Sequence, residues 1–160
     1  MEIRFAQPID LEEIIRLEQA NFSKEEQISE DVLKTYVHEF KETSLVMEES
    51  DEVVGFLLAC PSILPLVTDD IFFVNNGDKT EGDYLAIASL SVAESYKGQG
   101  IGTLLLAALK EVATYQGKKG IALTCKDYLV NYYEANQFED MGPSQSQFGY
   151  QTWIDMLWLD

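Results

Sequence analysis

A long apolar segment followed by clustered glycines and an apolar-faced helix constrains the fold more than any other part of the sequence. Residues 84–92, YLAIASLSV, are almost all apolar, which is typical of a central strand buried on both faces of a sheet. Three glycines follow within residues 98–102, and apolar residues then recur at intervals of three and four over 101–112. The succession of strand, glycine turn and helix predicts a helix packed against a sheet.

The other periodic segments alternate between helical and strand patterns. Helices are predicted from Asp10 to about Ala20, from Ser29 to before Thr43 and over 129–136, and strands over 44–48, 53–60, 121–125 and 151–159. A tight acidic turn joins the first two strands in a hairpin, and Pro61 is expected to end the second strand. This order predicts an α/β or α+β fold with a mixed sheet, in one domain covering residues 1–160.

Residues 62–82 fit no single period. The segment mixes apolar residues such as Ile71 and Phe72 with a turn predicted over 75–78. A long irregular insertion in a compact domain is usually functional or mobile, so this segment is a candidate for either role.

The chain is strongly acidic, with 11 Lys and Arg against 28 Asp and Glu and a formal net charge of −17. This charge repels nucleic acid and anionic membrane surfaces, whose binding depends on basic residues. It attracts cations, including protonated amines, unless the acidity serves only solubility. Five lysines against one glutamate give residues 97–126 a local charge of +4, so a polyanion is expected to bind there.

The cysteines and the apolar runs bear on compartment and partners. Cys60 and Cys125 are too few for a disulfide framework, lack metal-ligand spacing, and are expected to be buried thiols. No apolar run approaches the ~20 residues needed to span a bilayer. The opening segment lacks the basic-then-apolar order of a signal peptide. We expect a cytoplasmic monomer or homodimer with no metal ion, no nucleic acid and no membrane among its partners.

The glycine turn is a candidate anion site. A helix that begins at glycines leaves its first backbone N–H groups unpaired and the positive end of its dipole exposed. Glycine also lets a bulky anion approach where a Cβ would obstruct it. The P-loop pattern GxxxxGK[ST] and the dinucleotide fingerprint GxGxxG are both absent. The turn at 98–102 therefore predicts phosphate binding of another type, with a connection that binds no ligand as the alternative.

Two segments resemble motifs of one known family. The residues KGQGIG (97–102) resemble the [R/Q]-x-x-G-x-[G/A] acetyl-coenzyme A signature of the GNAT N-acetyltransferases, with Lys97 where Arg or Gln is usual. The residues YYEANQF (132–138) resemble the family's late Y-E-x-x-G-F motif, with Gln137 in place of the glycine.

The resemblance extends over most of the chain, from residue 3 to residue 157, and is weak over 62–82. Together with the late motif, residues 141–144 and 152–156 are similar to the arylalkylamine N-acetyltransferase branch. The resemblance implies the GNAT acyl-CoA acyltransferase fold. It also implies direct transfer of acetyl from acetyl-CoA to the primary amine of a small molecule.

The resemblance implies where the cofactor binds. In this family two neighbouring parallel strands splay apart, here 84–92 and 121–125, and the pantetheine arm inserts between them. Main-chain groups of Leu90 and Val92 would pair with the pantetheine amides. Backbone N–H groups of Lys97, Gly98, Gly100 and Gly102, with Thr103, would hold the pyrophosphate. The expected cofactor-binding residues are Leu90, Ser91, Val92, Lys97, Gly98, Gln99, Gly100, Ile101, Gly102 and Thr103.

The resemblance also assigns catalytic roles. Tyr133 occupies the position of the general acid that protonates the leaving thiolate, with the adjacent Tyr132 as the alternative register. The amide of Leu90 is the expected donor to the tetrahedral oxyanion. The arylalkylamine branch has histidines on the strand before the signature, and Ala86 and Ala88 stand at those positions here.

Removal of the proton from the ammonium therefore needs another group. The single histidine, His38, lies in the second predicted helix and is interpreted as a partly exposed helix residue. We expect ordered water to mediate the proton transfer, polarised by a carboxylate such as Glu81 or Asp83.

The acceptor is expected between the first two helices, the 62–82 segment and the open strand edge. Aromatic residues for its pocket are Phe22, Phe72, Phe73 and Tyr84, and carboxylates that would attract its charge are Glu25, Glu26, Asp69 and Asp70. Two alternatives stay open. One is acetylation of a protein or peptide, favoured by a shallow open groove, and the other is a catalytically silent acetyl-CoA-binding module.

Overall fold

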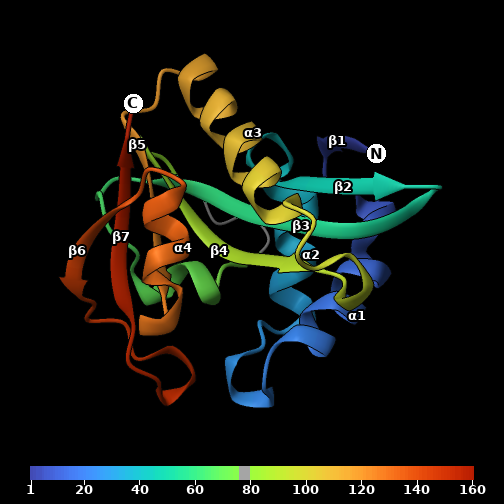
Figure 1. Ribbon diagram of the computed structural model, residues 1–160, viewed down its shortest axis with the longest axis horizontal. Coiled ribbons are helices and arrows are strands. Elements are labelled where there is room, and N and C mark those ends of the chain that lie inside the picture. Colours follow the sequence, from blue (N-terminus) through green and yellow to red (C-terminus); the bar gives the residue numbers. More distant parts are fainter. Residues whose placement is uncertain (76–79) are drawn as a thin grey trace.

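A seven-stranded sheet runs through the middle of the computed structural model, which describes residues 1–75 and 80–160 (Figure 1). The strands are β1 (Glu2–Phe5), β2 (Leu45–Glu49), β3 (Glu52–Ser62), β4 (Tyr84–Val92), β5 (Gly120–Cys125), β6 (Glu139–Pro143) and β7 (Ile154–Leu159). They lie in the order β1-β2-β3-β4-β5-β7-β6, and all neighbours are antiparallel except β4 and β5, which are parallel. The predicted mixed sheet is confirmed.

Two pairs of helices cover the two faces of the sheet. The helices α1 (Leu11–Asn21) and α2 (Glu30–Glu39) pack on one face, and α3 (Ile101–Tyr115) and α4 (Val130–Ala135) on the other (Figure 1). In β3, Phe56 and Leu58 pack toward α1 and α2, whereas Leu57 packs toward α3. Alternate side chains of a strand point to opposite faces, so a strand covered on both sides is a continuous apolar run. Among the helices of the described residues, none is long and apolar enough to cross a membrane.

The two edge strands, β1 and β6, are absent from the elements predicted from sequence. Both are short, with four and five residues, and most of their residues are exposed or half-buried. Such strands lack the run of apolar residues that identifies β3 and β4. Their pairing with β2 and β7 determines their structure, and the local sequence carries little trace of it.

Pro61 does not end β3, contrary to the prediction. The strand continues to Ser62, and Pro61 pairs with Leu85 of β4. The partner on the other side, β2, begins at Leu45 opposite Leu57, so it does not extend as far as Pro61. One edge of β3 is free of a strand at this point, and a proline, which has no N–H to donate, is tolerated there.

Much of the irregular segment packs into the core beside α2. Its buried side chains are Val67, Ile71, Phe72 and Val74. The hydroxyl of Tyr36 on α2 donates a hydrogen bond to the carbonyl of Ile71 (2.6 Å), which fastens the short helical turn η4 (Asp69–Phe72). The turn predicted over 75–78 lies largely outside the described residues.

Candidate active site

The parallel strands β4 and β5 separate after three paired residues. Tyr84–Ala86 pair with Gly120–Ala122, yet β4 continues to Val92 and β5 to Cys125. Where they separate, the register between β3 and β4 shifts, and Ala88 becomes an extra residue between the pairs Ala59–Ile87 and Leu58–Ser89. Such a bulge bends the strand that carries it, which accounts for β4 leaving its partner here. The predicted divergence of these two strands is confirmed.

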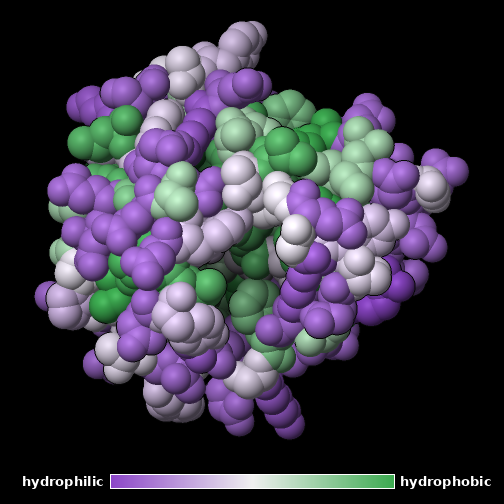
Figure 2. Space-filling model, viewed as in Figure 1, coloured by the Kyte–Doolittle hydropathy of each residue, from purple (hydrophilic) through white to green (hydrophobic). Residues whose placement is uncertain are grey.

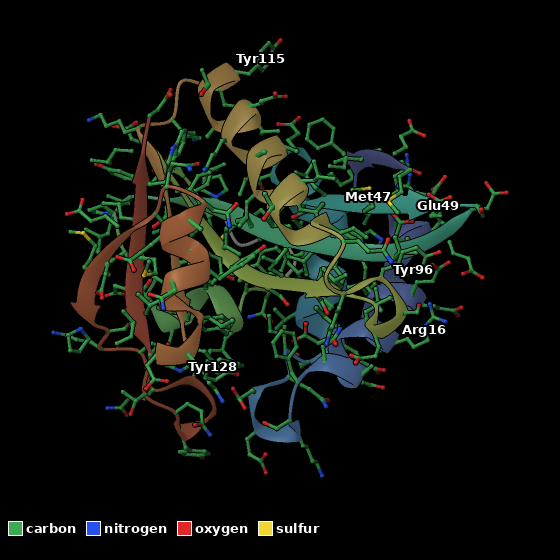
Figure 3. All side chains as sticks on the ribbon, viewed as in Figure 1. Arg16, Met47, Glu49, Tyr96, Tyr115 and Tyr128 are labelled. Atoms are coloured by element: carbon green, nitrogen blue, oxygen red, sulfur yellow. The ribbon has the colours of Figure 1, made fainter. Side chains whose placement is uncertain are left out.

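A cavity of about 210 Å³ opens between the separated strands. Its lining comes from both strands, α1, α4 and the loops around them: Glu18, Asn21, Phe22, Ser23, Glu26, Phe72, Ile87, Ala88, Ser89, Leu90, Leu123, Thr124, Cys125, Lys126, Tyr128, Leu129, Tyr133, Phe148 and Trp153. Figure 2 shows the face that carries α3 and α4 hollowed near its centre, with apolar residues inside the hollow. Figure 3 shows Tyr128, one of these lining residues, beside the first residue of α4.

The turn between β4 and α3 presents unpaired backbone donors. Gly98 and Gly100 both have φ of +80°, a conformation that favours glycine, and a Cβ at either would meet no atom within 4 Å. Leu104 is the first residue of α3 whose N–H donates a helical hydrogen bond, which the Gly100 carbonyl accepts. Within the described residues, no hydrogen bond uses the N–H of the six residues from Gly98 to Thr103. This row of donors at a helix N-terminus suits a phosphate.

Two expectations about this turn need correction. The N–H of Lys97, expected among the phosphate donors, bonds to the Glu94 carbonyl (3.3 Å), and its ammonium pairs with the Glu94 carboxylate (2.9 Å). The other lysines of the +4 stretch do not gather there. Lys110 bonds to the end of α4, Lys118 and Lys119 to the loop before β4, and Lys126 to Glu26. An anion bound at this turn would therefore be held by backbone donors, with little help from lysines.

The polar groups at the end of β4 are partly engaged by α1. The side-chain amide of Asn21 donates to the hydroxyl of Ser91 (2.5 Å) and to the carbonyl of Val92 (3.1 Å). The expected pairing of Val92 with pantetheine would therefore compete with Asn21. Leu90 lines the cavity directly, and the side chain of Ile101 is buried in the core so that only its main chain faces the turn. The side-chain amide of Gln99 bonds back to the Ser95 carbonyl (3.5 Å).

Tyr133 on α4 points into the cavity from the side of β5. Its ring is buried at 9% exposure and packs edge-on against Phe138, with centroids 5.9 Å apart. Burial, with smaller effects from Tyr132 and Cys125, raises the pKa of Tyr133 well above the usual range. The phenol therefore keeps its proton, and within the described residues no hydrogen bond uses its hydroxyl. A proton donor is thus placed beside the separated strands.

Glu18 on α1 is a carboxylate in the cavity that the sequence analysis missed. Only 1% of the residue is exposed, and its two oxygens accept hydrogen bonds from the Ser89 hydroxyl (2.7 Å) and the Ile28 N–H (2.9 Å). Burial raises the pKa of Glu18, and these two hydrogen bonds offset the rise only in part. The available signal was its place four residues after the buried Ile14, which puts a glutamate on the apolar face of α1.

Three segments close over one side of the cavity and form what we call the roof: 22–28, 67–74 and 144–153. Lys126 pairs with Glu26 (2.8 Å), and that ion pair, together with a hydrogen bond from Ser23, holds the pKa of Glu26 below its usual range despite partial burial. Phe72 stacks on Phe148 with centroids 4.3 Å apart. The indole of Trp153, which lines the cavity, donates to the Phe148 carbonyl (2.9 Å).

The predicted acceptor residues divide into two groups, and the first lies at the roof. Phe22, Phe72 and Glu26 line the cavity. Phe73 is 62% exposed and packs edge-on against Phe148. Asp69 accepts a hydrogen bond from Ser146 (2.5 Å), so it joins two roof segments, while Glu25 and Asp70 are exposed.

The second group lies away from the cavity, which corrects the expectation. Glu81, Asp83 and Tyr84 stand at or before the start of β4, where the strands are still paired. Six residues separate Tyr84 from Leu90, about 20 Å along an extended strand. Asp83 pairs there with Lys119 (3.3 Å). The exposed His38 lies on α2, outside the cavity lining, and its ring bonds to the Lys34 carbonyl.

The two cysteines are buried, as expected, and Cys125 lines the cavity. Within residues 1–75 and 80–160, no group of three His, Cys, Asp or Glu side chains is arranged to hold a metal ion.

The sequence model of the acetyltransferase (GNAT) family matches residues 11–138, which is 128 of the 160 residues. The chain therefore belongs to the GNAT acetyltransferase family, and the acyltransferase class predicted from its motifs is confirmed. A comparison with curated protein sequences gives no match.

Solved structures share the fold at low sequence identity. The loading GNATL domain of CurA from Lyngbya majuscula has a TM-score of 0.82 and 13% identity, with 99% of this chain and 96% of that chain covered. A ribosomal-protein-alanine N-acetyltransferase from Brucella melitensis has a TM-score of 0.70 and 20% identity, with both chains fully covered. Diaminobutyrate acetyltransferase from Paenibacillus lautus, in complex with its substrate and coenzyme A, has a TM-score of 0.69 and 15% identity. The match covers 99% of this chain and 94% of that chain.

We predict that both cysteines react slowly with a thiol-alkylating reagent in the native protein at pH 8. Burial raises the pKa of Cys60 and of Cys125 to about 11, so about one thiol in a thousand is ionised at that pH. Labelling followed by mass spectrometry should speed up as the pH approaches 11. It should become fast at pH 8 in urea, where the ordinary pKa returns. Rapid labelling of native Cys125 at pH 7.5 would contradict its burial.

Proposed function

We propose that this protein transfers an acetyl group from acetyl-CoA to the primary amine of a small molecule. The observation that carries the proposal is the position of the cavity, between separated parallel strands and beside six unpaired backbone donors. Membership of the GNAT family supports the reaction class. The roof supports a small acceptor, and the buried carboxylate of Glu18 supports an amine.

The residues present fit coenzyme A. The N–H groups of Gly98–Thr103 would hold its pyrophosphate, since no Cβ and no other atom crowds Gly98 or Gly100. Backbone groups exposed where β4 leaves β5 would pair with the pantetheine amides, as an added strand would. When bound, acetyl-CoA supplies an acetyl thioester between the two strands.

The side chains of the cavity would manage the protons. Glu18, whose pKa is raised by burial, would accept the proton of the acceptor ammonium directly or through a water. Tyr133, kept protonated by burial, would donate a proton to the leaving sulfur. The Leu90 amide would donate a hydrogen bond to the oxyanion. Glu18 takes the place that the sequence analysis assigned to Glu81 or Asp83.

The roof favours a small acceptor over a polypeptide. The Phe72–Phe148 stack joins two roof segments, and the ion pair between Lys126 and Glu26 ties the third to the end of β5. A peptide, which continues beyond its reacting amine, would need this roof to open. Lys126 neutralises Glu26, so the carboxylate of Glu18 is the group that, when ionised, would complement a single ammonium.

The proposal is tested first by cofactor binding and an acceptor screen. We expect calorimetry to show saturable binding of acetyl-CoA, and Gly100→Glu to abolish it, because a carboxylate would enter the anion site. Gly117→Glu, at the other end of α3, is the matched control and should bind normally. Consumption of acetyl-CoA should then be measured over arylalkylamines, polyamines, aminoglycosides and peptides. Wild-type protein that gives neither heat nor a thermal shift with the cofactor would end the proposal.

Tyr133→Phe separates an enzyme from a silent binding module. The change removes a hydroxyl that the described hydrogen bonds do not use and keeps the ring packed on Phe138, so the fold should persist. We expect kcat to fall about 10²-fold or more, because general acid catalysis contributes 10²–10⁴-fold, with little change in acetyl-CoA affinity. Unchanged turnover in an established assay would show that Tyr133 is not the acid.

Glu18→Gln tests the proton acceptor. An amide can still accept from the Ile28 N–H and donate to Ser89, so the local contacts survive. We expect kcat/KM to fall about 10²-fold or more and to lose the part of its pH dependence that rises through the elevated pKa of Glu18. Glu12→Gln, on the exposed side of α1, is the matched control.

The Glu18→Gln variant should lose activity without losing thermal stability. Because the folded-state pKa of Glu18 is raised, its ionisation costs folding free energy as the pH rises through that pKa, and a neutral glutamine removes this cost. Thermal unfolding of Glu18→Gln at neutral pH should therefore occur at the wild-type temperature or higher. A variant that unfolds at a lower temperature and loses activity in proportion would indicate a structural role instead.

A further inference from the structure

We infer that Tyr132 is a further residue of the cofactor site, with its hydroxyl placed to donate a hydrogen bond to the diphosphate held by the glycine turn. The inference rests on the proposed function, since it needs coenzyme A as the ligand.

Tyr132 and Tyr133 are consecutive residues of α4 and point in different directions. One residue turns a helix by about 100°, so the neighbour of a cavity-facing tyrosine faces another element. The two rings meet edge to face, with centroids 5.1 Å apart and planes at 78°. Tyr133 lines the cavity between the strands, whereas Tyr132 is directed at the first turn of α3.

The position of the Tyr132 hydroxyl is defined by two contacts. A Cβ built on Gly102 would lie 2.5 Å from the hydroxyl oxygen, so this oxygen lies directly against the second residue of α3. The hydroxyl of Thr103 is 3.4 Å away. Both Gly102 and Thr103 belong to the row of residues whose N–H groups are unpaired. The phenol therefore borders the anion site.

The contact with Thr103 leaves the phenol free to donate elsewhere. Hydroxyl hydrogen bonds are usually 2.7–2.8 Å, and at 3.4 Å the pair is long. The site is exposed to solvent, so no burial cost ties the two hydroxyls together. An oxyanion accepting from the N–H groups of Gly102 and Thr103 would offer Tyr132 a stronger, charge-assisted acceptor. The O–H would then add a seventh donor to the six amides.

The same geometry shows what glycine at position 102 makes room for. Any larger side chain would displace the Tyr132 hydroxyl, since a Cβ alone would come within 2.5 Å of it. It also links the part of the site that would hold the diphosphate with the part that would hold the thioester. The residue that would contact the diphosphate is joined by one peptide bond to the residue that would protonate the sulfur.

The test is the affinity of Tyr132→Phe for coenzyme A, measured by calorimetry. Loss of one charge-assisted hydrogen bond should weaken binding about 10-fold or more. The matched control is Tyr115→Phe, because Tyr115 is 92% exposed at the far end of α3 and points away from the molecule (Figure 3). Thermal unfolding without ligand should be unchanged in both variants, which separates a binding effect from a folding effect.

A second experiment shows which part of the cofactor the Tyr132 hydroxyl contacts. S-acetylpantetheine lacks the diphosphate, so its kcat/KM as acetyl donor should be the same for wild type and Tyr132→Phe. An equal loss with both donors would place the contact on the pantetheine arm and overturn the inference, as would a coenzyme A affinity within twofold of wild type. If S-acetylpantetheine supports no turnover with either protein, the calorimetric affinities decide alone. Wild-type protein that binds no coenzyme A would overturn the proposed function as well.

Discussion

The loss of pairing between β4 and β5 is the feature on which the rest of the site depends. Three parallel pairs, Tyr84–Ala86 with Gly120–Ala122, hold the strands together, and the bulge at Ala88 then turns β4 away. A buried parallel sheet normally satisfies its backbone groups between strands, so this opening leaves polar groups that a ligand can pair with. The same divergence makes room for Tyr133 and Glu18 to face one cavity from opposite sides of the sheet.

The glycine turn explains how an acidic protein could bind the anionic cofactor that we propose for it. The six donors of residues 98–103 are main-chain groups, so their field depends on the glycine turn and the helix dipole and needs no excess of lysines. Lys97 is paired with Glu94, and the other lysines of the 97–126 stretch bind elsewhere. The acidic charge near the cavity is concentrated instead on the acceptor side, in Glu18 and Glu26, where a cationic amine would enter.

The sequence predicted the elements whose side chains follow a strong local period. Residues 84–92 identified β4 by their apolar run and 101–112 identified α3 by its apolar face, and the glycine turn between them predicted an anion site. The sequence did not predict β1 and β6, which are short and mostly exposed. It also did not predict that Tyr84 and Glu81 lie away from the cavity, because their position depends on where β4 and β5 stop pairing. Glu18 was missed because the partners that make it notable, Ser89 and Ile28, are brought to it only by folding.

The substitution of Gln137 for the family's glycine shows how a tertiary contact can compensate for an unfavourable backbone. Gln137 has φ of +68°, a conformation in which glycine costs least. Lys110 on α3 bonds to the Asn136 carbonyl and to the Gln137 side chain (3.2 Å), and its ammonium lies over the Phe138 and Trp158 rings at 5.3 and 5.6 Å. These contacts tie the end of α4 to α3, the helix whose first turn Tyr132 touches. Lys110 thus anchors the end of α4 that follows Tyr132 and Tyr133, which limits how far the two tyrosines can move from α3.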